Sequence, residues 1–465
     1  MEMTIEIAES GFGENRLYPQ NDIGIAQLFF NLHRGNILYV AEAKSWYTFD
    51  GQRWDKDEGG FKTMELCKSF VRAFGDYAEQ TRTDDNEFLK WAGKLTSRRN
   101  REGILRDAMS IAPVSIGEFD KDLLLINVQN GTLNLKNYTL QPHNPADMIT
   151  KLAGVKYNPM ARCTRWDNFI NEIMCDDVEL AVYLQKVLGY SLTGLTEYEE
   201  FYILYGEKTR NGKTTLIEGV ANIFGDYACN IQPQSLAKRG IDGAAPSPDM
   251  ARLKGARFVT APEPEKGLEL NIALLKQLTG GDRYTARHLN ANPFEFKPEF
   301  KLLFTTNHLP RTADDTVFAS GRVKLIPFER HFSENEQDRN LKRMFRKSTN
   351  RSHILNWLIA GLRLVRETGL VAPPRVVAAI EAYRSEADVL GTFLAEFTVE
   401  DEKNYLPTSL LYPYYHKWAK DNGYSWLNNT DFVVELRKKV TIKRNGKIGN
   451  RIVGLSLAPD VIPQK

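Results

Sequence analysis

The sequence has few cysteines, no long apolar run and no basic leader, and each of these shortages excludes a class of protein. Its 465 residues include four cysteines, none paired at the spacing of about two to four residues that zinc knuckles use, and seven scattered histidines, so we expect no zinc site. No apolar stretch approaches the ~20 residues that span a bilayer. The acidic N-terminus lacks the basic and then apolar order of a signal peptide. We therefore expect a protein without membrane contacts, in the cytoplasm of a host cell.

The net charge is also small, at +2, so nucleic-acid binding has to come from local basic patches. Hydrophobic residues make up 42% and charged residues 26%, which is typical of a soluble globular protein. At ~150 residues per domain, the length predicts about three domains.

Residues 1–110 predict a small α+β region. Residues 37–40 and 46–49 have the composition of short strands, and Asp50–Gly51 is a hairpin turn signal. Residues 63–109 have a helical pattern that ends near the basic run 98–101. Such a run is usually a solvated helix face, and nucleic-acid binding is the alternative.

The remaining chain predicts four further parts. Residues 111–195 contain a strand at 123–128, a turn at Asn130–Gly131 and amphipathic helices around Trp166 and Val187. Residues 196–345 alternate apolar strands with helical segments, which indicates a parallel sheet. Residues 346–382 are helical with a joint at Pro373–Pro374, and residues 383–465 form a separate small unit.

An apolar strand at residues 200–205 is followed by a loop with glycines and by a helix at 216–224. Strand, loop, Gly-Lys-Thr and helix in this order indicate a P-loop. The N–H groups of such a loop and of the helix start bind phosphates, the lysine places its charge on the β- and γ-phosphates, and the threonine hydroxyl binds Mg²⁺. The predicted ATP-binding residues are Gly206, Asn211, Gly212, Lys213, Thr214 and Thr215.

This loop departs from the general pattern. Gly206 and Gly212 have five residues between them instead of four, and Glu207 stands where the first glycine of the pattern belongs. A Gly-Lys-Thr that occurs by chance on a loop is the alternative interpretation.

Polar residues stand at the ends of three further predicted strands, at 256–261, 301–306 and 323–327. Glu263 and Glu265 follow the first, Asn307 follows the second, and Arg322 precedes the third. Carboxylates there can hold Mg²⁺ through its waters and polarise the attacking water, and an amide can reach the γ-phosphate. Arg322 becomes catalytic if it reaches the ATP of a neighbouring subunit. The plainer alternatives are a solvated loop, a turn cap and a surface charge.

These four pieces, in this order, resemble the superfamily 3 helicases, in particular the phage, plasmid and poxvirus-type primase-helicases. The resemblance is carried by residues 211–215, 263–267, 274–282, 304–310 and 322–328, with residues 127–131 and 188–194 in the preceding domain. It implies an α/β fold with a P-loop, AAA+-like ATPase core. An N-terminal α+β region and a helical domain precede this core, and a winged-helix-like domain follows it.

The resemblance also implies a ring, usually a homo-hexamer, with ATP and Mg²⁺ at subunit interfaces and DNA in the channel. Family members often have two adjacent arginines at the arginine-finger position, whereas here Gly321 precedes Arg322. The matched positions are Lys213 and Thr214 for Walker A, Glu263 for the Walker B acid with Glu265 as its partner, Asn307 for sensor 1 and Arg322 for the finger, with Thr214 and Glu263 at the metal.

Residues 276–296 resemble the family's extra motif and its channel hairpin, with strands at 283–289 and 293–296 and a tip at 290–292. Cationic and polar groups at such a tip can grip a phosphate backbone without reading sequence. The candidate residues are Lys276, Arg287 and His288, and a polar surface hairpin is the alternative.

The tail predicts two helices, capped by Thr408 and Thr430, and a hairpin with strands at 440–443 and 452–455. Residues 437–451 contain seven lysines or arginines and no acid. A basic second helix with a basic wing is typical of a duplex-DNA binder, and we expect Lys443, Arg444 and Lys447 to contact DNA. A solvated basic face is the alternative.

Together these features predict an ATP-dependent DNA helicase that acts in the replication of a phage, plasmid or other mobile element and translocates on DNA as a ring. A separate primase or polymerase is a possible partner. The alternatives are an origin-binding initiator that melts DNA, the helicase part of a primase-helicase system, a primase, and an unrelated P-loop packaging or signalling ATPase. About 110 N-terminal residues are too few for a polymerase-type domain beside the predicted hairpin and helices.

Overall fold

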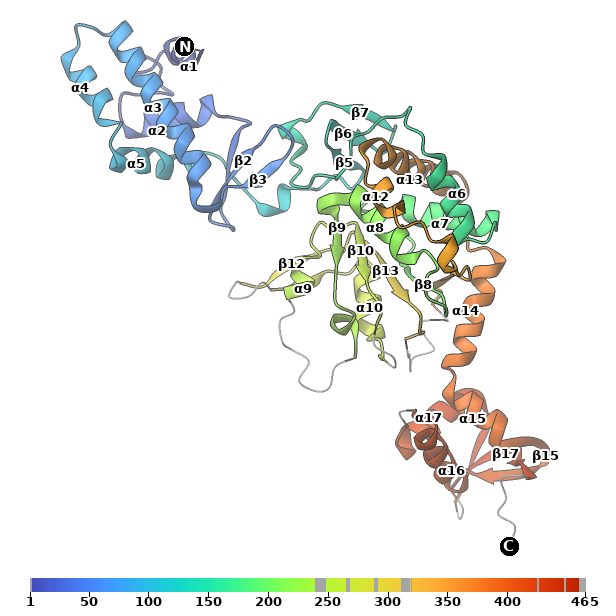
Figure 1. The fold of residues 1–465 in the computed structure, drawn as a ribbon. Helices are drawn as coiled ribbons and strands as arrows, with labels where there is room; N and C mark the ends of the chain where they lie inside the picture. The colour runs from blue at the N-terminus through green and yellow to red at the C-terminus, as the bar shows by residue number, and fades with distance from the viewer. Residues whose placement is uncertain are drawn as a thin grey trace.

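The computed structural model describes residues 2–238, 248–264, 268–287, 292–310, 318, 320–424, 426–446 and 449–459. The chain is elongated, with a helical N-terminal unit at one end, a central sheet and a C-terminal unit at the other end (Figure 1). Among the described residues, no helix combines the length and the apolar character that crossing a bilayer requires.

The N-terminal unit combines helices with a small sheet, as the sequence predicts. An aromatic core that includes Phe29, Phe70 and Phe74 holds its helices together. The parallel pairing of β4 with β1 extends the sheet past residue 110, where the sequence predicts that the unit ends. The elements are α1 (Glu2–Glu9), α2 (Asp22–Leu32), β1 (Ile37–Val40), β2 (Ser45–Phe49), β3 (Trp54–Lys56), α3 (Phe61–Thr81), α4 (Asn86–Lys94), α5 (Arg98–Ala108) and β4 (Pro113–Val114), in the sheet order β3-β2-β1-β4.

The second unit contains an antiparallel sheet of β5 (Leu125–Val128), β6 (Gly131–Asn134) and β7 (Thr139–Gln141), followed by α6 (Thr164–Ile173) and α7 (Val178–Tyr190). Helix α7 packs against α13 (Ser348–Thr368), which belongs to the segment after the central sheet. A side chain at Gly189 or Gly361 would overlap the backbone of the facing helix, so both glycines permit this close approach. One hydrophobic core therefore continues from the second unit into the central unit.

The central sheet has five parallel strands in the order β14-β8-β13-β10-β9. Four of them match predicted strands, and β9 is an addition to the prediction. The strands are β8 (Phe201–Tyr205), β9 (Ala228–Asn230), β10 (Phe258–Ala261), β13 (Lys301–Thr306) and β14 (Val323–Pro327). Because all strands run the same way, the segments that follow β8, β10 and β13 leave from one edge of the sheet, the carboxyl edge, and the residues that precede the strands lie at the opposite amino edge.

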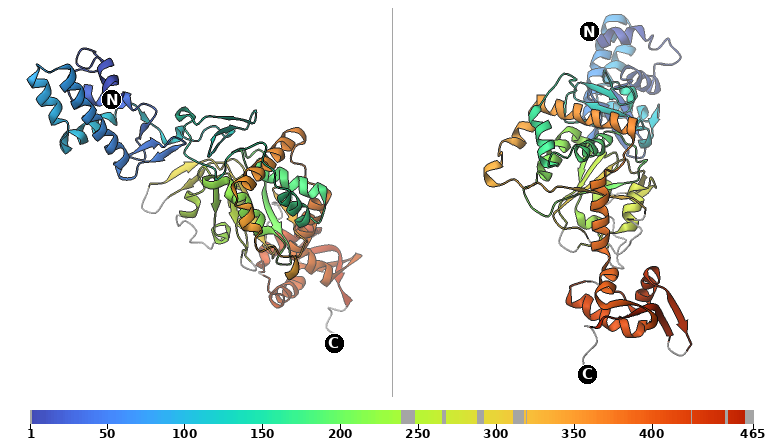
Figure 2. Two further views of the ribbon diagram at one scale, coloured as in Figure 1. Left: turned by 45° about the horizontal axis from the view of Figure 1, so that its top comes forward. Right: turned by 90° about the vertical axis from the view of Figure 1, so that its right-hand side faces the viewer.

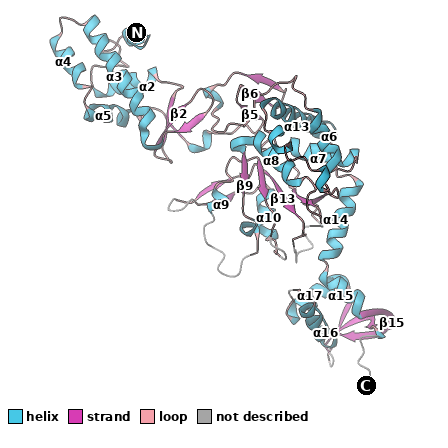
Figure 3. Cartoon of the chain, viewed as in Figure 1, coloured by secondary structure: helices cyan, strands magenta, loops and turns pink. Residues whose placement is uncertain are grey.

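Helix α8 (Lys213–Phe224) follows β8 directly, and α10 (Ile272–Thr279) leads to a hairpin of β11 (Tyr284–Ala286) and β12 (Phe294–Phe296). This antiparallel pairing confirms the predicted hairpin. The short α9 (Pro248–Ala251) lies near it, and α12 (Leu341–Phe345) packs on α8 after the sheet. Figure 3 shows the hairpin strands projecting to one side of the central sheet.

Helix α14 (Pro374–Ala387) connects the central unit to the C-terminal unit, and the right view in Figure 2 shows the latter projecting away from the sheet. Pro373 and Pro374 stand at its start, as predicted. The helix does not end at 383, where the sequence predicts the last unit to begin. Tyr383 is buried against Phe318, and its hydroxyl donates to the Pro310 carbonyl at 2.6 Å. The change to the C-terminal unit comes at Asp388, whose side chain caps the next helix.

The C-terminal unit contains α15 (Val389–Phe397), α16 (Thr408–Asp421) and α17 (Asn429–Lys439) with a sheet of β15 (Thr398–Pro407), β17 (Gly449–Leu457) and β16 (Ile442–Asn445). The two predicted helices and the hairpin are present, but both predicted caps are wrong. Pro407 occupies the cap position of α16, and the Thr408 hydroxyl donates to the Asn450 carbonyl instead. Asn428 caps α17, because its side chain accepts from the N–H groups of Thr430 and Asp431.

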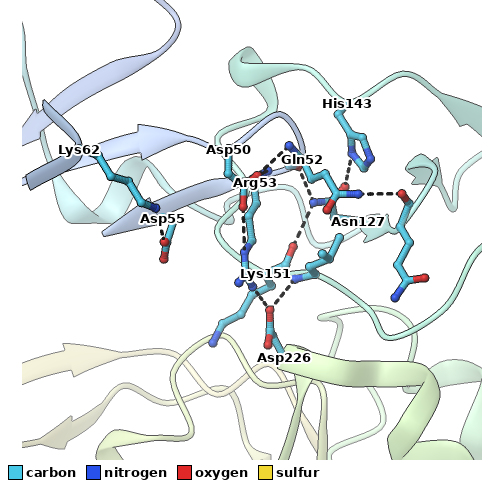
Figure 4. Close-up of polar contacts among 11 residues, drawn as sticks. Asp50, Gln52, Arg53, Asp55, Lys62, Asn127, His143, Lys151 and Asp226 are labelled. Carbon is cyan, nitrogen blue, oxygen red and sulfur yellow. Dashed lines mark hydrogen bonds and ion pairs between the residues drawn. The ribbon is translucent and has the colours of Figure 1, made fainter. Parts of the chain in front are cut away.

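A polar junction joins the N-terminal unit to the second and central units (Figure 4). The Gln52 side chain donates to the Gln129 carbonyl at 2.7 Å, and Asn127 Nδ2 donates back to the Gln52 carbonyl at 2.8 Å. The Arg53 guanidinium pairs with Asp226, which lies just after α8 and also accepts from the Leu152 N–H at 3.0 Å. The two residues that follow the predicted turn at Asp50–Gly51 thus make the contacts that attach the N-terminal unit to its neighbours.

Candidate functional site

Lys213, Asn307 and Glu263 meet at the carboxyl edge of the central sheet. Lys213 is the first residue of α8, and its ammonium donates to the Asn307 side-chain oxygen at 2.7 Å and to the Gly206 carbonyl at 3.2 Å. Asn307 follows β13, the neighbour of β8, and its N–H donates to a Glu263 carboxylate oxygen at 3.3 Å. Three predicted site residues that are far apart in the sequence therefore form one cluster.

The surroundings of Lys213 change its acidity. Its side chain is buried, and this burial lowers its pKa from about 10.5 to about 8, while the charge of Glu263 acts in the opposite direction. The hydrogen-bond acceptors of this buried ammonium are neutral oxygens, which do not balance its charge. The site therefore favours the binding of an anion.

The loop between β8 and α8 requires glycine at both predicted positions. A side chain at Gly206 would overlap the Asn211 side chain and the Phe328 backbone. Gly212 has a φ of +86°, and a side chain there would overlap Ile173. Both glycines therefore let the loop pass close to its neighbours, as a phosphate-binding loop requires.

The additional residue of this loop is accommodated by contacts outside the P-loop pattern. The buried Asn211 closes the loop by donating to the Lys208 carbonyl at 2.7 Å. Arg210 has a φ of +56°, and its carbonyl accepts from the Phe332 N–H at 2.9 Å. The segment after β14 thus anchors the longer loop and leaves Gly212 and Lys213 at the start of α8.

Thr214 and Thr215 lie in the first turn of α8, where backbone N–H groups have no acceptor within the helix. Thr214 and Glu263 are both exposed beside Lys213. Hydroxyl and carboxylate oxygens suit Mg²⁺, which usually keeps several waters and takes few protein ligands. Among the described residues, no group of three or more His, Cys, Asp or Glu side chains could hold a metal ion by itself. Glu265 lies outside the described residues.

Arg322 lies at the amino edge of the same sheet, where it precedes β14. Its guanidinium pairs with Glu199 and donates to the Thr279 hydroxyl at 3.1 Å and to the Lys276 carbonyl at 3.4 Å. A five-residue strand is roughly 16 Å long, and that length separates this edge from Lys213. The structure therefore does not bring Arg322 to the Lys213 cluster of its own chain.

The other predicted DNA-contacting residues fall on two surfaces. Lys276 is part of α10, and Arg287 is exposed directly after β11. Lys443 and Arg444 are exposed on β16. His288 and Lys447 lie outside the described residues.

The C-terminal unit adds an exposed aromatic that the sequence does not single out. Arg451 lies opposite Lys443 across two paired strands, and its guanidinium sits 5.0 Å from the ring centre of Tyr405. The half-exposed Tyr405 comes from β15, a strand that the sequence does not predict.

Buried charges at the amino edge are a second feature that sequence reasoning misses. The buried Lys301 donates to the Thr193 and Leu195 carbonyls at 2.6 and 2.9 Å, and Arg257 donates to the Leu192 carbonyl at 2.7 Å. These cations tie the end of the second unit to the sheet. Burial also raises the pKa of the nearby Glu299 to about 7. The available signal was a charged residue at the start of an otherwise apolar strand.

Three family descriptions match successive parts of the chain. Residues 26–175 match a family described as "D5 N terminal like", residues 204–322 match a family of unknown function, and residues 385–451 match "Poxvirus D5 protein-like". The first and last matches flank the central sheet, and the middle match begins within β8 and ends just before β14, so it includes β9, β10 and β13.

Viral proteins carry the similarity in sequence. A protein named "Putative helicase" from Acanthamoeba polyphaga mimivirus is 26% identical over 417 residues, 81% of this chain and 43% of its own length. A protein of the same name from Frog virus 3 is 30% identical over 229 residues, 46% of this chain and 24% of its own length. The chain thus spans less than half the length of these relatives.

The fold of almost the whole chain also occurs in a solved structure. The A form apo structure of the NrS-1 C-terminal region covers 94% of this chain and 100% of its own, with a TM-score of 0.52 and 12% identity. The order of units described above is therefore shared with that protein.

Proposed function

Because this chain belongs to the D5-type primase-helicase family, we propose that it binds ATP with Mg²⁺ and couples hydrolysis to DNA unwinding during replication of a mobile genome. The observation that carries the proposal is the meeting of Lys213, Asn307 and Glu263 behind a glycine loop at the carboxyl edge of the sheet. The strand order β14-β8-β13-β10-β9, with the loop between β8 and α8, supports an AAA+-type P-loop core.

Each residue of the cluster has a distinct proposed role. Lys213 exchanges its contact with Asn307 for the β- and γ-phosphates, because a phosphate is a stronger partner than a neutral amide for a partly desolvated ammonium. Asn307 is then free to contact the γ-phosphate or the attacking water. Glu263 orients that water. Together with the Thr214 hydroxyl, Glu263 would hold Mg²⁺, which would supply positive charge next to the phosphates.

Arg322 is proposed to complete the ATP site of a neighbouring subunit in a ring, usually a hexamer. The support is its position: it lies at the amino edge of the sheet, opposite its own Lys213, about a strand length away from the nucleotide site of its own chain. In the same ring, Lys276 and Arg287 near the β11–β12 hairpin would contact DNA in the channel.

The C-terminal unit is proposed to bind duplex DNA as a winged-helix-type domain. Its support is the set of basic residues on α17 and β16, including the exposed Lys443 and Arg444. The same feature suits an origin-binding initiator, which melts DNA and unwinds little. A strand-displacement assay on a forked duplex separates the two, because a helicase releases the strand processively with ATP.

Lys213→Ala tests the nucleotide site. The Lys213 ammonium donates its hydrogen bonds to Gly206 and Asn307 within the site itself, so the variant should fold and lose ATPase activity. Wild-type hydrolysis by a folded variant would refute the assignment. Arg322→Ala should also lose hydrolysis but keep ATP binding. Mixing the two variants should restore part of the activity, because some interfaces then combine an intact P-loop with an intact finger.

A further inference from the structure

The guanidinium of Arg322 is held by three groups of its own subunit. One terminal nitrogen donates to the Thr279 hydroxyl and to the Lys276 carbonyl, and the other pairs with the Glu199 carboxylate. These contacts use three of the five N–H donors of the arginine. Only 20% of the Arg322 side chain is exposed, so the group lies folded against its own chain and does not project toward a neighbour.

The three partners are of two kinds. Thr279 is buried in the last turn of α10, and the same helix contributes the Lys276 carbonyl. The partners of Arg322 on this side are therefore neutral and covered by protein. Glu199 is charged, and 47% of its side chain is exposed. The carboxylate is therefore the partner that solvent or a second molecule can replace.

The backbone at Glu199 supports a role for its side chain. Glu199 has a φ of +54°, a left-handed conformation that glycine adopts freely and that a residue with a Cβ adopts at a cost. Glycine would suit this turn better if only the backbone mattered. The ion pair with Arg322 is the interaction that glutamate adds at this position.

We propose that Glu199 is a positioning residue for Arg322: its carboxylate is a displaceable counter-ion that holds the finger in its own subunit until the γ-phosphate of a neighbour's ATP replaces it. Thr279 and the Lys276 carbonyl orient the guanidinium during the exchange. This inference rests on the proposed action of Arg322 on a neighbouring subunit. An exposed ion pair changes an equilibrium by roughly up to fivefold, so release needs little compensation.

Glu199→Gln tests the inference in the full chain. Glutamine keeps the size and an acceptor oxygen but removes the charge that competes with phosphate. At ATP concentrations well below saturation, the hydrolysis rate should rise by about two- to fivefold. The matched control is Glu197→Gln, which removes the same charge from an exposed residue in the same turn and should leave the rate unchanged.

Subunit mixing shows on which side of the interface Glu199 acts. In a mixture of Lys213→Ala and Arg322→Ala, every active interface takes its finger from the Lys213→Ala subunit. Glu199→Gln added to that subunit should raise the rate of the mixture, whereas the same change added to the Arg322→Ala subunit should not.

The outcomes separate the inference from the proposed function. An inactive parent mixture, although both variants assemble and exchange subunits, would refute the action of Arg322 across the interface. Three outcomes with an active mixture of Lys213→Ala and Arg322→Ala would overturn the role of Glu199 alone. They are an unchanged rate on adding Glu199→Gln, a lower rate, and a rise that appears when the change is in the Arg322→Ala subunit.

Discussion

Raising the pH should weaken ATP binding, because Lys213 loses its charge unusually close to neutrality. Burial lowers its pKa to about 8, and the charge of Glu263 opposes this shift. Bound phosphates favour the charged lysine, so its pKa is higher in the complex than in the free protein. Binding above about pH 8 must therefore take up a proton, and the apparent affinity falls as the pH rises through this value.

The size of the effect follows from the fraction of charged lysine. With a pKa of about 8, most of Lys213 is charged at pH 7, and about a tenth of it is charged at pH 9. The dissociation constant for a non-hydrolysable ATP analogue with Mg²⁺ should therefore rise about tenfold between these pH values. Calorimetry in two buffers with different heats of ionisation should detect the proton uptake directly.

Lys213→Arg is the matched control. Arginine stays charged over this whole range, so the variant should show a nearly constant affinity even if that affinity is lower. A pH-independent wild-type protein would refute the reasoning. An equal loss of affinity in the arginine variant would assign the titration to another group.

Three further predictions concern the fold and the tail. Burial raises the Glu299 pKa to about 7, so the free energy of unfolding should fall as pH rises from about 4.5 through 7. The expected fall is on the order of 3 kcal/mol, and Glu299→Gln should remove most of it. Urea titrations at pH 5 and 8 measure both. Gly212→Ala should abolish ATP binding, because its φ of +86° and its contact with Ile173 exclude a side chain; wild-type binding by a folded variant would contradict this. Deleting residues 388–465 should spare basal ATPase activity but lower duplex affinity and its salt dependence, and an unchanged salt slope would argue against DNA binding by this unit.

Four of the five strands of the central sheet were predictable because they are apolar runs in a βα alternation, whereas β9 has only three residues and was not predicted. The caps of α16 and α17 were not, because several residues near each start can cap a helix and only the packing selects one. Asn428 and Thr430 both lie near the start of α17, but Asn428 precedes the first helical residue, and its side chain accepts from the N–H groups of Thr430 and Asp431.

The candidate nucleotide site was predictable for a different reason. Lys213, Glu263 and Asn307 each directly follow a predicted loop or strand end, and parallel strands bring such ends to one edge. No such rule predicts which residues contact Arg322. Glu199 precedes β8 and Thr279 ends α10, and only the completed sheet with its covering helix brings them to the arginine.

The direction of the strands also limits what one subunit can do. The carboxyl edge presents Lys213, Asn307 and Glu263, and the amino edge presents Arg322 with its counter-ion Glu199. A rigid parallel sheet cannot bring its two edges to the same nucleotide, since a strand length of roughly 16 Å lies between them. If Arg322 contributes to hydrolysis, it must do so at an ATP held by another copy of the chain. An isolated subunit then keeps its phosphate-binding lysine but lacks a finger, so its activity per subunit depends on assembly, and Glu199 holds the finger until that assembly supplies a phosphate.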